Sequence, residues 1–103
     1  MNVDSAHLLL TDNQAAGRFE ANYGGEVLGY ITYQIRDGVM QLPHTFVKPA
    51  ARGQNVAALL TEHALQSARA QGLRVLPICW YVDRYIRRNP QYRDLLNYPE
   101  PDD

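Results

Sequence analysis

Residues 47–60 read VKPAARGQNVAALL and mark the point where a strand, a short loop and a long helix follow one another. The helix is predicted over residues 54–71, because apolar side chains recur there at spacings of three and four (Val56, Leu59, Leu60, Ala64 and Ala68). The first turn of a helix leaves backbone N–H groups without intrahelical partners and carries about half a positive charge. The loop is therefore predicted to bind an anion, since Gly53 lets a phosphate approach the backbone and Arg52 adds a charged contact.

Strands flank this segment on both sides. Upstream, β-branched and aromatic residues or alternating polarity predict strands over residues 7–10, 18–23, 26–35 and 39–47, with a turn at Arg36-Asp37-Gly38 joining the last two. Gly72 stands where a left-handed residue ends the helix, and a strand over 73–78 right after it implies a crossover with parallel pairing. Two short helical pieces are predicted over 81–88 and 90–96, with Pro90 in the first turn of the second.

The resulting fold class is α+β, with a mixed and mostly antiparallel sheet, one long crossover helix and short C-terminal helices. Val27, Ile31, Tyr33 and Ile35 share one face of the predicted third strand, and Gly29 on that face suggests a bulge. Pro43 lacks a backbone donor, so a break or bulge is also expected in the strand 39–47.

Length and composition limit the classes of function. A chain of 103 residues with 46% hydrophobic residues has the size of one domain, here assigned to 1–103 with a core over 7–96 and an acidic tail over 97–103. A formal charge of −1 argues against nucleic-acid binding, although nine of the ten cationic residues are Arg. Cys79 alone makes no disulfide, and neither His7 nor His63 has a companion at metal-ligand spacing. No membrane span or signal peptide is recognised, so a cytoplasmic protein is expected.

The segment 47–57 resembles the GNAT N-acetyltransferases, in which V-x-P-x-x-R-G-x-G/A leads into the helix that holds the coenzyme A pyrophosphate. His44-Thr45, the pattern Pro77-x-Cys79-x-Tyr81, and Tyr85 followed by Asn89-Pro90-x-Tyr92 are similar to the small, single-domain YjdJ-type branch of that family. The resemblance covers residues 18–96. It implies acetyl-CoA as the donor, no metal, and a set of cofactor-binding residues comprising Val47, Arg52, Gly53, Gln54, Asn55, Val56 and Ala57.

Two residues depart from the family's pattern. Asn55 stands where a second glycine is usual, and Asn tolerates a left-handed backbone better than most residues. Asn89 stands where the branch usually has His before Pro, so proton transfer at that position is not expected, while a structural capping role is.

The resemblance implies that the strand after the long helix separates from its neighbour and that the acetyl thioester enters the gap, with Cys79 at its edge. Cys79 then either carries the acetyl group covalently or only lines the pocket; taken alone, a single cysteine at a strand end is more often a buried small hydrophobe. His44, on the strand opposite, is a candidate base for the thiol or for an incoming amine. Tyr81 and Tyr85 are candidates to protonate the departing thiolate, although tyrosines mostly serve packing.

The function expected from these residues is transfer of an acetyl group from acetyl-CoA to an amine acceptor, which is a protein lysine, an N-terminus or a small amine. The alternative is a non-catalytic module that binds coenzyme A or acyl-CoA, or a protein-interaction domain on the same scaffold. The basic cluster of Arg84, Arg87, Arg88 and Arg93 is interpreted as a solvated helix face, with contact to the 3′-phosphate of coenzyme A as the second interpretation. A monomer or a weak dimer is expected.

Overall fold

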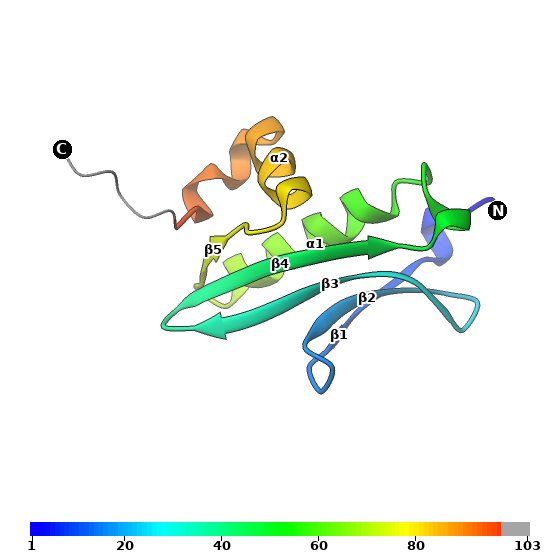
Figure 1. The fold of residues 1–103 in the computed structure, drawn as a ribbon, viewed down its shortest axis with the longest axis horizontal. Helices are drawn as coiled ribbons and strands as arrows, with labels where there is room; N and C mark the ends of the chain where they lie inside the picture. Colours follow the sequence, from blue (N-terminus) through cyan, green and yellow to red (C-terminus); the bar gives the residue numbers. More distant parts are fainter. Residues whose placement is uncertain (98–103) are drawn as a thin grey trace.

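Five strands form one sheet in the order β1-β2-β3-β4-β5 (Figure 1). The computed structural model describes residues 1–97. The strands β1 (Leu9–Asn13), β2 (Arg18–Tyr23), β3 (Glu26–Arg36) and β4 (Val39–Val47) are antiparallel neighbours, and β5 (Arg74–Leu76) runs parallel to β4. The predicted α+β class with a mixed, mostly antiparallel sheet is confirmed. Of the predicted acidic tail, only Asn97 lies within the described residues, and its backbone N–H donates to the carbonyl of Val75 at 2.9 Å.

The predicted first strand over 7–10 is wrong at both ends. Residues Ser5–His7 form a 3₁₀ turn, because the Asp4 carboxylate accepts the N–H of Ala6 at 3.0 Å and contacts His7 Nδ1 at 2.8 Å. The strand then continues three residues beyond its predicted end, to Asn13, whose side-chain oxygen accepts the N–H of Ala16 and starts the turn.

Two α-helices follow the meander. The helix α1 (Val56–Ala70) begins two residues later than predicted, because Asn55 is left-handed with φ 69°. At its other end Gly72 has φ 69°, as the sequence predicts for a helix stop. The helix α2 (Trp80–Arg88) and the 3₁₀ helix η3 (Pro90–Leu95) correspond to the two predicted C-terminal pieces, and a further 3₁₀ turn, η2 (Pro49–Ala51), follows β4.

Both expected irregularities in the sheet are present. The β2–β3 register shifts so that Leu28 is the extra residue beside Gly29, and Leu28 rather than Val27 is fully buried. The β3–β4 register shifts between Thr32 and Gln34, where one residue of β3 faces the pair Leu42-Pro43. This second bulge reverses which alternate residues of β4 face the core, with a direct effect on the site.

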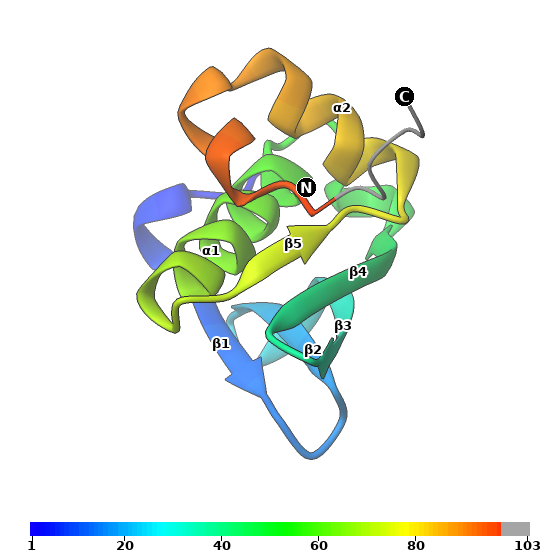
Figure 2. The ribbon, with the colours of Figure 1, turned by 90° about the vertical axis from the view of Figure 1, so that its left-hand side faces the viewer.

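The core lies between α1 and one face of the sheet. Phe19 of β2 packs edge-on against His63 of α1, with ring centroids 5.6 Å apart. His63 is half-buried, as expected for a residue beside the apolar stripe. Both helices lie on the same side of the strands in the turned view (Figure 2), so among the described residues no helix covers the other face of β2, β3 and β4. The fully buried side chains of α1 and the sheet include Ile31, Met40, Leu42, Leu60, Ala64 and Leu65.

Candidate functional site: the gap between two parallel strands

The parallel pairing of β4 and β5 stops after three residue pairs. Val39, Met40 and Gln41 pair with Arg74, Val75 and Leu76. One further backbone bond joins the two segments, from the N–H of Cys79 to the carbonyl of Leu42 at 2.9 Å. Pro77 has no N–H to continue the ladder, and the chain turns away from β4 while β4 continues for five more residues. The predicted strand 73–78 is accordingly shortened to 74–76.

A pocket of about 480 Å³ occupies the gap beyond this last bond. The predicted catalytic residues Cys79, His44 and Tyr81 all line it. Three of the predicted cofactor-binding residues, Val47, Arg52 and Ala57, line it as well, and the remaining lining residues are Thr45, Phe46 and Trp80.

The β4 wall of the pocket presents side chains to both faces of the sheet. Thr45 pairs with Ile31 of β3, which belongs to the core, so Thr45 and its alternate neighbour Val47 lie on the α1 face. His44 and Phe46 lie on the face that no helix covers, where both rings neighbour Tyr30 at centroid distances of 6.1 and 5.4 Å. The pocket therefore connects the two faces of the sheet.

Alternate backbone groups of β4 are also directed into the gap. Lys48 donates its N–H to the carbonyl of Leu28 in β3, so in an antiparallel ladder the backbone groups of Thr45 and Val47 point away from β3. In agreement, the carbonyl of Val47 accepts from Arg52 Nε at 3.1 Å. The N–H groups of Thr45 and Val47 thus lie on the side of β4 that β5 has left.

The loop before α1 leaves the start of the helix without a side-chain cap. Asn55 occupies the N-cap position but makes no side-chain capping bond, and the first intrahelical bond runs from Leu59 N–H to the Asn55 carbonyl at 3.1 Å. The first-turn amides are therefore available to an anion. Gly53 has φ 78°, and a β-carbon at this position would meet no atom within 4 Å, so the loop surface beside it is open.

The other predicted cofactor-binding residues lie beside the pocket rather than in its lining. The Val56 side chain is buried in the core. Gln54 accepts the backbone N–H of Val3 at 3.1 Å and so fastens the N-terminal segment to this loop. Gly53 and Asn55 are exposed, and Asn55 adopts a left-handed backbone, which asparagine tolerates better than most residues.

Cys79 is partly buried at the start of α2, and its partner is Thr45. The Cys79 Sγ lies 3.5 Å from Thr45 Oγ1. We expected His44 to face the thiol from β4, but the bulge at Leu42-Pro43 turns His44 to the opposite face and brings Thr45 to Cys79. His44 is exposed, and no described residue hydrogen-bonds to its ring. Thr45 belongs to the His44-Thr45 pattern, but only the strand register shows that Thr45 is the residue that contacts Cys79.

The tyrosines of α2 are held in the neutral form. Burial raises the pKa of Tyr81, the residue that lines the gap. Burial also raises the pKa of Tyr85 one turn later, with a smaller contribution from the charge of Glu62 on α1. A protonated phenol is a hydrogen-bond donor, so Tyr81 can give a hydrogen bond or a proton to a group in the pocket.

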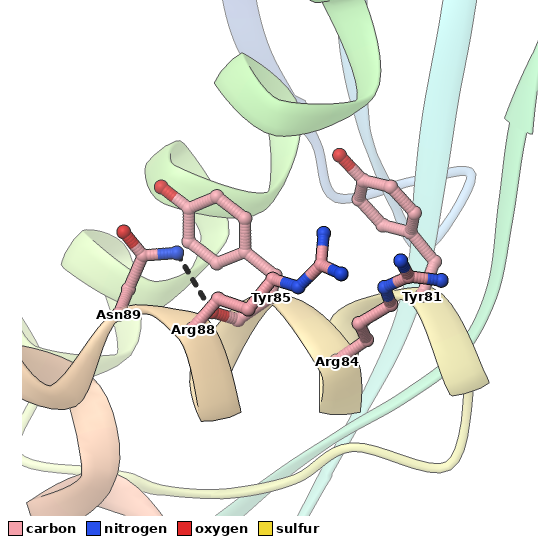
Figure 3. Close-up of a pocket in the computed structure, with 5 residues that line it drawn as sticks. All are labelled: Tyr81, Arg84, Tyr85, Arg88 and Asn89. Carbon is pink, nitrogen blue, oxygen red and sulfur yellow. Dashed lines mark hydrogen bonds between the residues drawn. The ribbon is translucent and has the colours of Figure 1, made fainter.

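The predicted basic cluster divides into two sets. Arg87 donates from Nε to the Asp83 carboxylate at 2.9 Å, and Arg93 donates to the Arg87 carbonyl at 2.8 Å. Arg84 and Arg88 instead line a second, smaller hollow with Tyr81, Tyr85 and Asn89 (Figure 3).

Asn89 has the capping role that the sequence left open. Its Nδ2 donates to the Tyr85 carbonyl at 2.7 Å at the end of α2, and its own carbonyl accepts the N–H of Tyr92 at 3.0 Å at the start of η3. The side-chain amide is sufficient for the first of these bonds, and the second uses the backbone carbonyl of Asn89.

Two kinds of site find no support within residues 1–97. These residues contain no group of three or more His, Cys, Asp or Glu side chains arranged to hold a metal ion. None of the helices over the same range is long and apolar enough to cross a membrane.

Comparison with known protein families gives a match over most of the chain. The family model described as GCN5-related N-acetyl-transferase matches residues 18–95. Among curated proteins, the chain is 35% identical over 60 residues to Protein NATD1 of Mus musculus and of Homo sapiens. These matches cover 56% of this chain and 54% and 53% of the two relatives, so the similarity spans about half of their length.

Solved structures share the fold. A GCN5-like protein from Staphylococcus aureus superposes with a TM-score of 0.70 at 22% identity, covering 92% of this chain and 93% of that one. A GNAT-family acetyltransferase from Brucella melitensis, solved in complex with acetyl-CoA, superposes with a TM-score of 0.54 at 26% identity. That match covers 66% of this chain and 50% of the Brucella chain.

Proposed function

Because the chain belongs to the GCN5-related N-acetyltransferase family, we propose that it binds acetyl-CoA in the gap between β4 and β5 and transfers the acetyl group to an amine. One observation carries this proposal. A single pocket, opened where β5 leaves β4, is lined by Cys79, His44 and Tyr81 together with Val47 and Arg52. The Brucella relative binds acetyl-CoA, which supports the same ligand for this chain.

The residues present fit a coenzyme A thioester. The uncapped start of α1 offers backbone donors to the pyrophosphate, and the open surface at Gly53 lets the phosphates approach. Arg52 already folds over the end of β4 through its bond to Val47 and has further guanidinium N–H groups to offer. The pocket between the strands has room for a slender arm ending in the thioester.

When bound, acetyl-CoA supplies an acetyl group activated as a thioester. The N–H groups of Thr45 and Val47 are proposed to stabilise the negative charge that develops on the thioester oxygen. In direct transfer, the amine nitrogen bonds to the acetyl carbon, the carbon–sulfur bond breaks, His44 accepts the amine proton, and Tyr81 gives a proton to the departing sulfur. His44 suits an amine that arrives at the face of the sheet away from α1.

A relay through Cys79 is the second route. The Cys79 sulfur bonds to the acetyl carbon as the coenzyme A sulfur leaves with a proton, and the amine then takes the acetyl group and returns a proton to Cys79. The Thr45 hydroxyl, 3.5 Å from Sγ, is placed to hydrogen-bond the thiolate. We favour chemical involvement of Cys79, because the pattern Pro77-x-Cys79 distinguishes the small branch that the chain resembles.

Thermal unfolding with and without ligand tests the binding step. A ligand that binds only the folded state at a hundredfold excess over its Kd adds about 2.7 kcal/mol of stability, which raises the Tm measurably. Gly53→Val places a branched side chain on the open loop surface and should remove most of this shift. An unchanged melting curve of the wild type in millimolar acetyl-CoA would contradict the proposal.

Turnover distinguishes the enzyme from the non-catalytic alternative. The protein is incubated with acetyl-CoA labelled in the acetyl group and with pools of peptides, polyamines and small amines. Label appearing in an amine product supports acetyltransfer, whereas tight binding with intact acetyl-CoA indicates a binding module.

A further inference from the structure

A second hollow of about 90 Å³ lies on α2 beside the β4–β5 gap. Tyr81, Arg84, Tyr85, Arg88 and Asn89 line it, at positions three or four apart on one helix face. Tyr81 lines both this hollow and the pocket of the gap, so the two are adjacent. Figure 3 shows the Arg88 guanidinium between the side chains of Tyr85 and Tyr81, and the Arg84 guanidinium beside Tyr81.

The two arginines of this face are Arg84 and Arg88, and their charges are not paired with a carboxylate among residues 1–97. Within residues 1–97, Arg18, Arg69 and Arg87 each have a carboxylate partner, whereas neither Arg84 nor Arg88 has an ion pair or a hydrogen bond. Both are exposed. Arg84 and Arg88 stand one turn apart on α2, about 6 Å along the helix axis, so their like charges repel one another and an anion between them would reduce that repulsion.

The tyrosines make the same face a donor surface. Burial raises the pKa of both phenols, so their hydroxyl groups remain protonated near neutral pH and can donate to an anion. The nearby negative group is Glu62 of α1, which acts on Tyr85. Aromatic rings beside guanidinium groups also offer a flat surface on which a nucleobase can stack.

Coenzyme A carries more phosphate than the loop before α1 can hold. Its pyrophosphate matches the first-turn amides of α1 and Arg52, but its ribose carries a separate 3′-phosphate away from the pyrophosphate. Arginine is the side chain best suited to a phosphate, because its planar fork makes paired charge-assisted bonds. The unpaired arginines nearest to the gap on α2 are Arg84 and Arg88.

We propose that Arg84 and Arg88, with the hydroxyl group of Tyr85, bind the 3′-phosphate of coenzyme A and make the chain select for it. This inference rests on the proposed function, since it assumes a coenzyme A thioester in the gap. It makes α2 a specificity element: thioesters that lack the 3′-phosphate, including those of a bare phosphopantetheine arm, bind more weakly.

Calorimetric titration with coenzyme A and with 3′-dephospho-coenzyme A tests the proposal by binding alone. Charge-assisted hydrogen bonds contribute roughly 1.5–3 kcal/mol, so the wild type should prefer coenzyme A by about tenfold to a hundredfold. The double variant R84Q/R88Q should bind both ligands with the wild type's affinity for 3′-dephospho-coenzyme A. The control R36Q/R87Q removes the same charge at the β3–β4 turn and on another part of α2, and should keep the preference.

The outcomes separate this inference from the proposed function. Equal wild-type affinities for the two ligands, or a preference that survives in R84Q/R88Q, would overturn the inference and leave coenzyme A binding intact. If R36Q/R87Q lost the preference to the same extent, the preference would be an effect of net charge, and the inference would be overturned as well. Binding of neither ligand would contradict the proposed function itself.

Discussion

Gly29 is the position where one added methyl group tests whether the end of β4 forms the ligand site. It pairs with Val47 across the β3–β4 ladder, and a β-carbon there would lie 2.7 Å from the Phe46 carbonyl oxygen, 3.2 Å from Val47 Cγ2 and 3.3 Å from Val47 Cα. The distance to the Phe46 oxygen is shorter than real β-carbons show. Because this oxygen belongs to the backbone, it cannot move aside as the end of a flexible side chain would. Gly29 is held on its other side by Ala21 of β2, so Phe46 and Val47 must move.

Gly29→Ala should lower the free energy of unfolding. Overpacking costs about 1–3 kcal/mol, and the lower entropy of the unfolded Ala variant offsets about 0.4–1 kcal/mol of that. At roughly 4–8 °C per kcal/mol for a domain of this size, the Tm should fall on the order of 5–15 °C. The variant remains folded at 25 °C if the wild type has the ordinary stability of about 5–15 kcal/mol.

The same movement should weaken acetyl-CoA binding, because Phe46 and Val47 line the gap. A shift of several tenths of an ångström in such a wall is expected to cost on the order of tenfold in affinity, measured by titration calorimetry at 25 °C. Gly38→Ala is the control: its β-carbon meets no atom within 4 Å, and its φ of 75° imposes about 1–2 kcal/mol of strain at the far end of β4. Equal affinity of Gly29→Ala and Gly38→Ala for acetyl-CoA would refute the assignment of this wall to the ligand.

Four further substitutions probe the site and the sheet. Arg52→Ala should weaken coenzyme A about tenfold to a hundredfold in a binding titration while changing the Tm little, and equal binding would place the phosphates elsewhere. Cys79→Ala should abolish both turnover and a one-acetyl mass adduct if the relay operates; if transfer is direct, it should keep much of its activity and His44→Ala should be the more damaging change. Burial and the bond to Asp12 raise the pKa of Tyr33 to about 12, above its unfolded value near 10, so wild-type stability should fall as pH rises from about 10 to about 12. Tyr33→Phe should lose less over that window in urea titrations, and an equal loss would contradict the cause given.

Patterns among neighbouring residues in the sequence predicted most strands and the long helix correctly. Strands β2 and β4 begin and end where alternation and turn residues indicated, and the apolar stripe of α1 faces the core. The ends of β1 were not predictable in this way, because a contact between the Asp4 carboxylate and His7 and a turn fixed by the Asn13 side chain decide them. Several polar residues nearby have a similar propensity for turns, and their positions in the folded chain decide which of them makes the contact.

The site depends most on the bulge in β4 at Leu42-Pro43. The sequence predicted a break or bulge near Pro43, but not its effect on which side chains of β4 face the core. Met40 and Leu42 are buried, so unbroken alternation would put His44 into the core and Thr45 outside it. One extra residue at Leu42-Pro43 reverses this order, and Thr45 rather than His44 meets Cys79. The imidazole is thereby separated from the thiol and exposed on the opposite face of the sheet. If the acceptor amine arrives on that face, a base for the amine and a thiol for the acetyl group act from opposite sides of one gap, and either can be removed without disturbing the other.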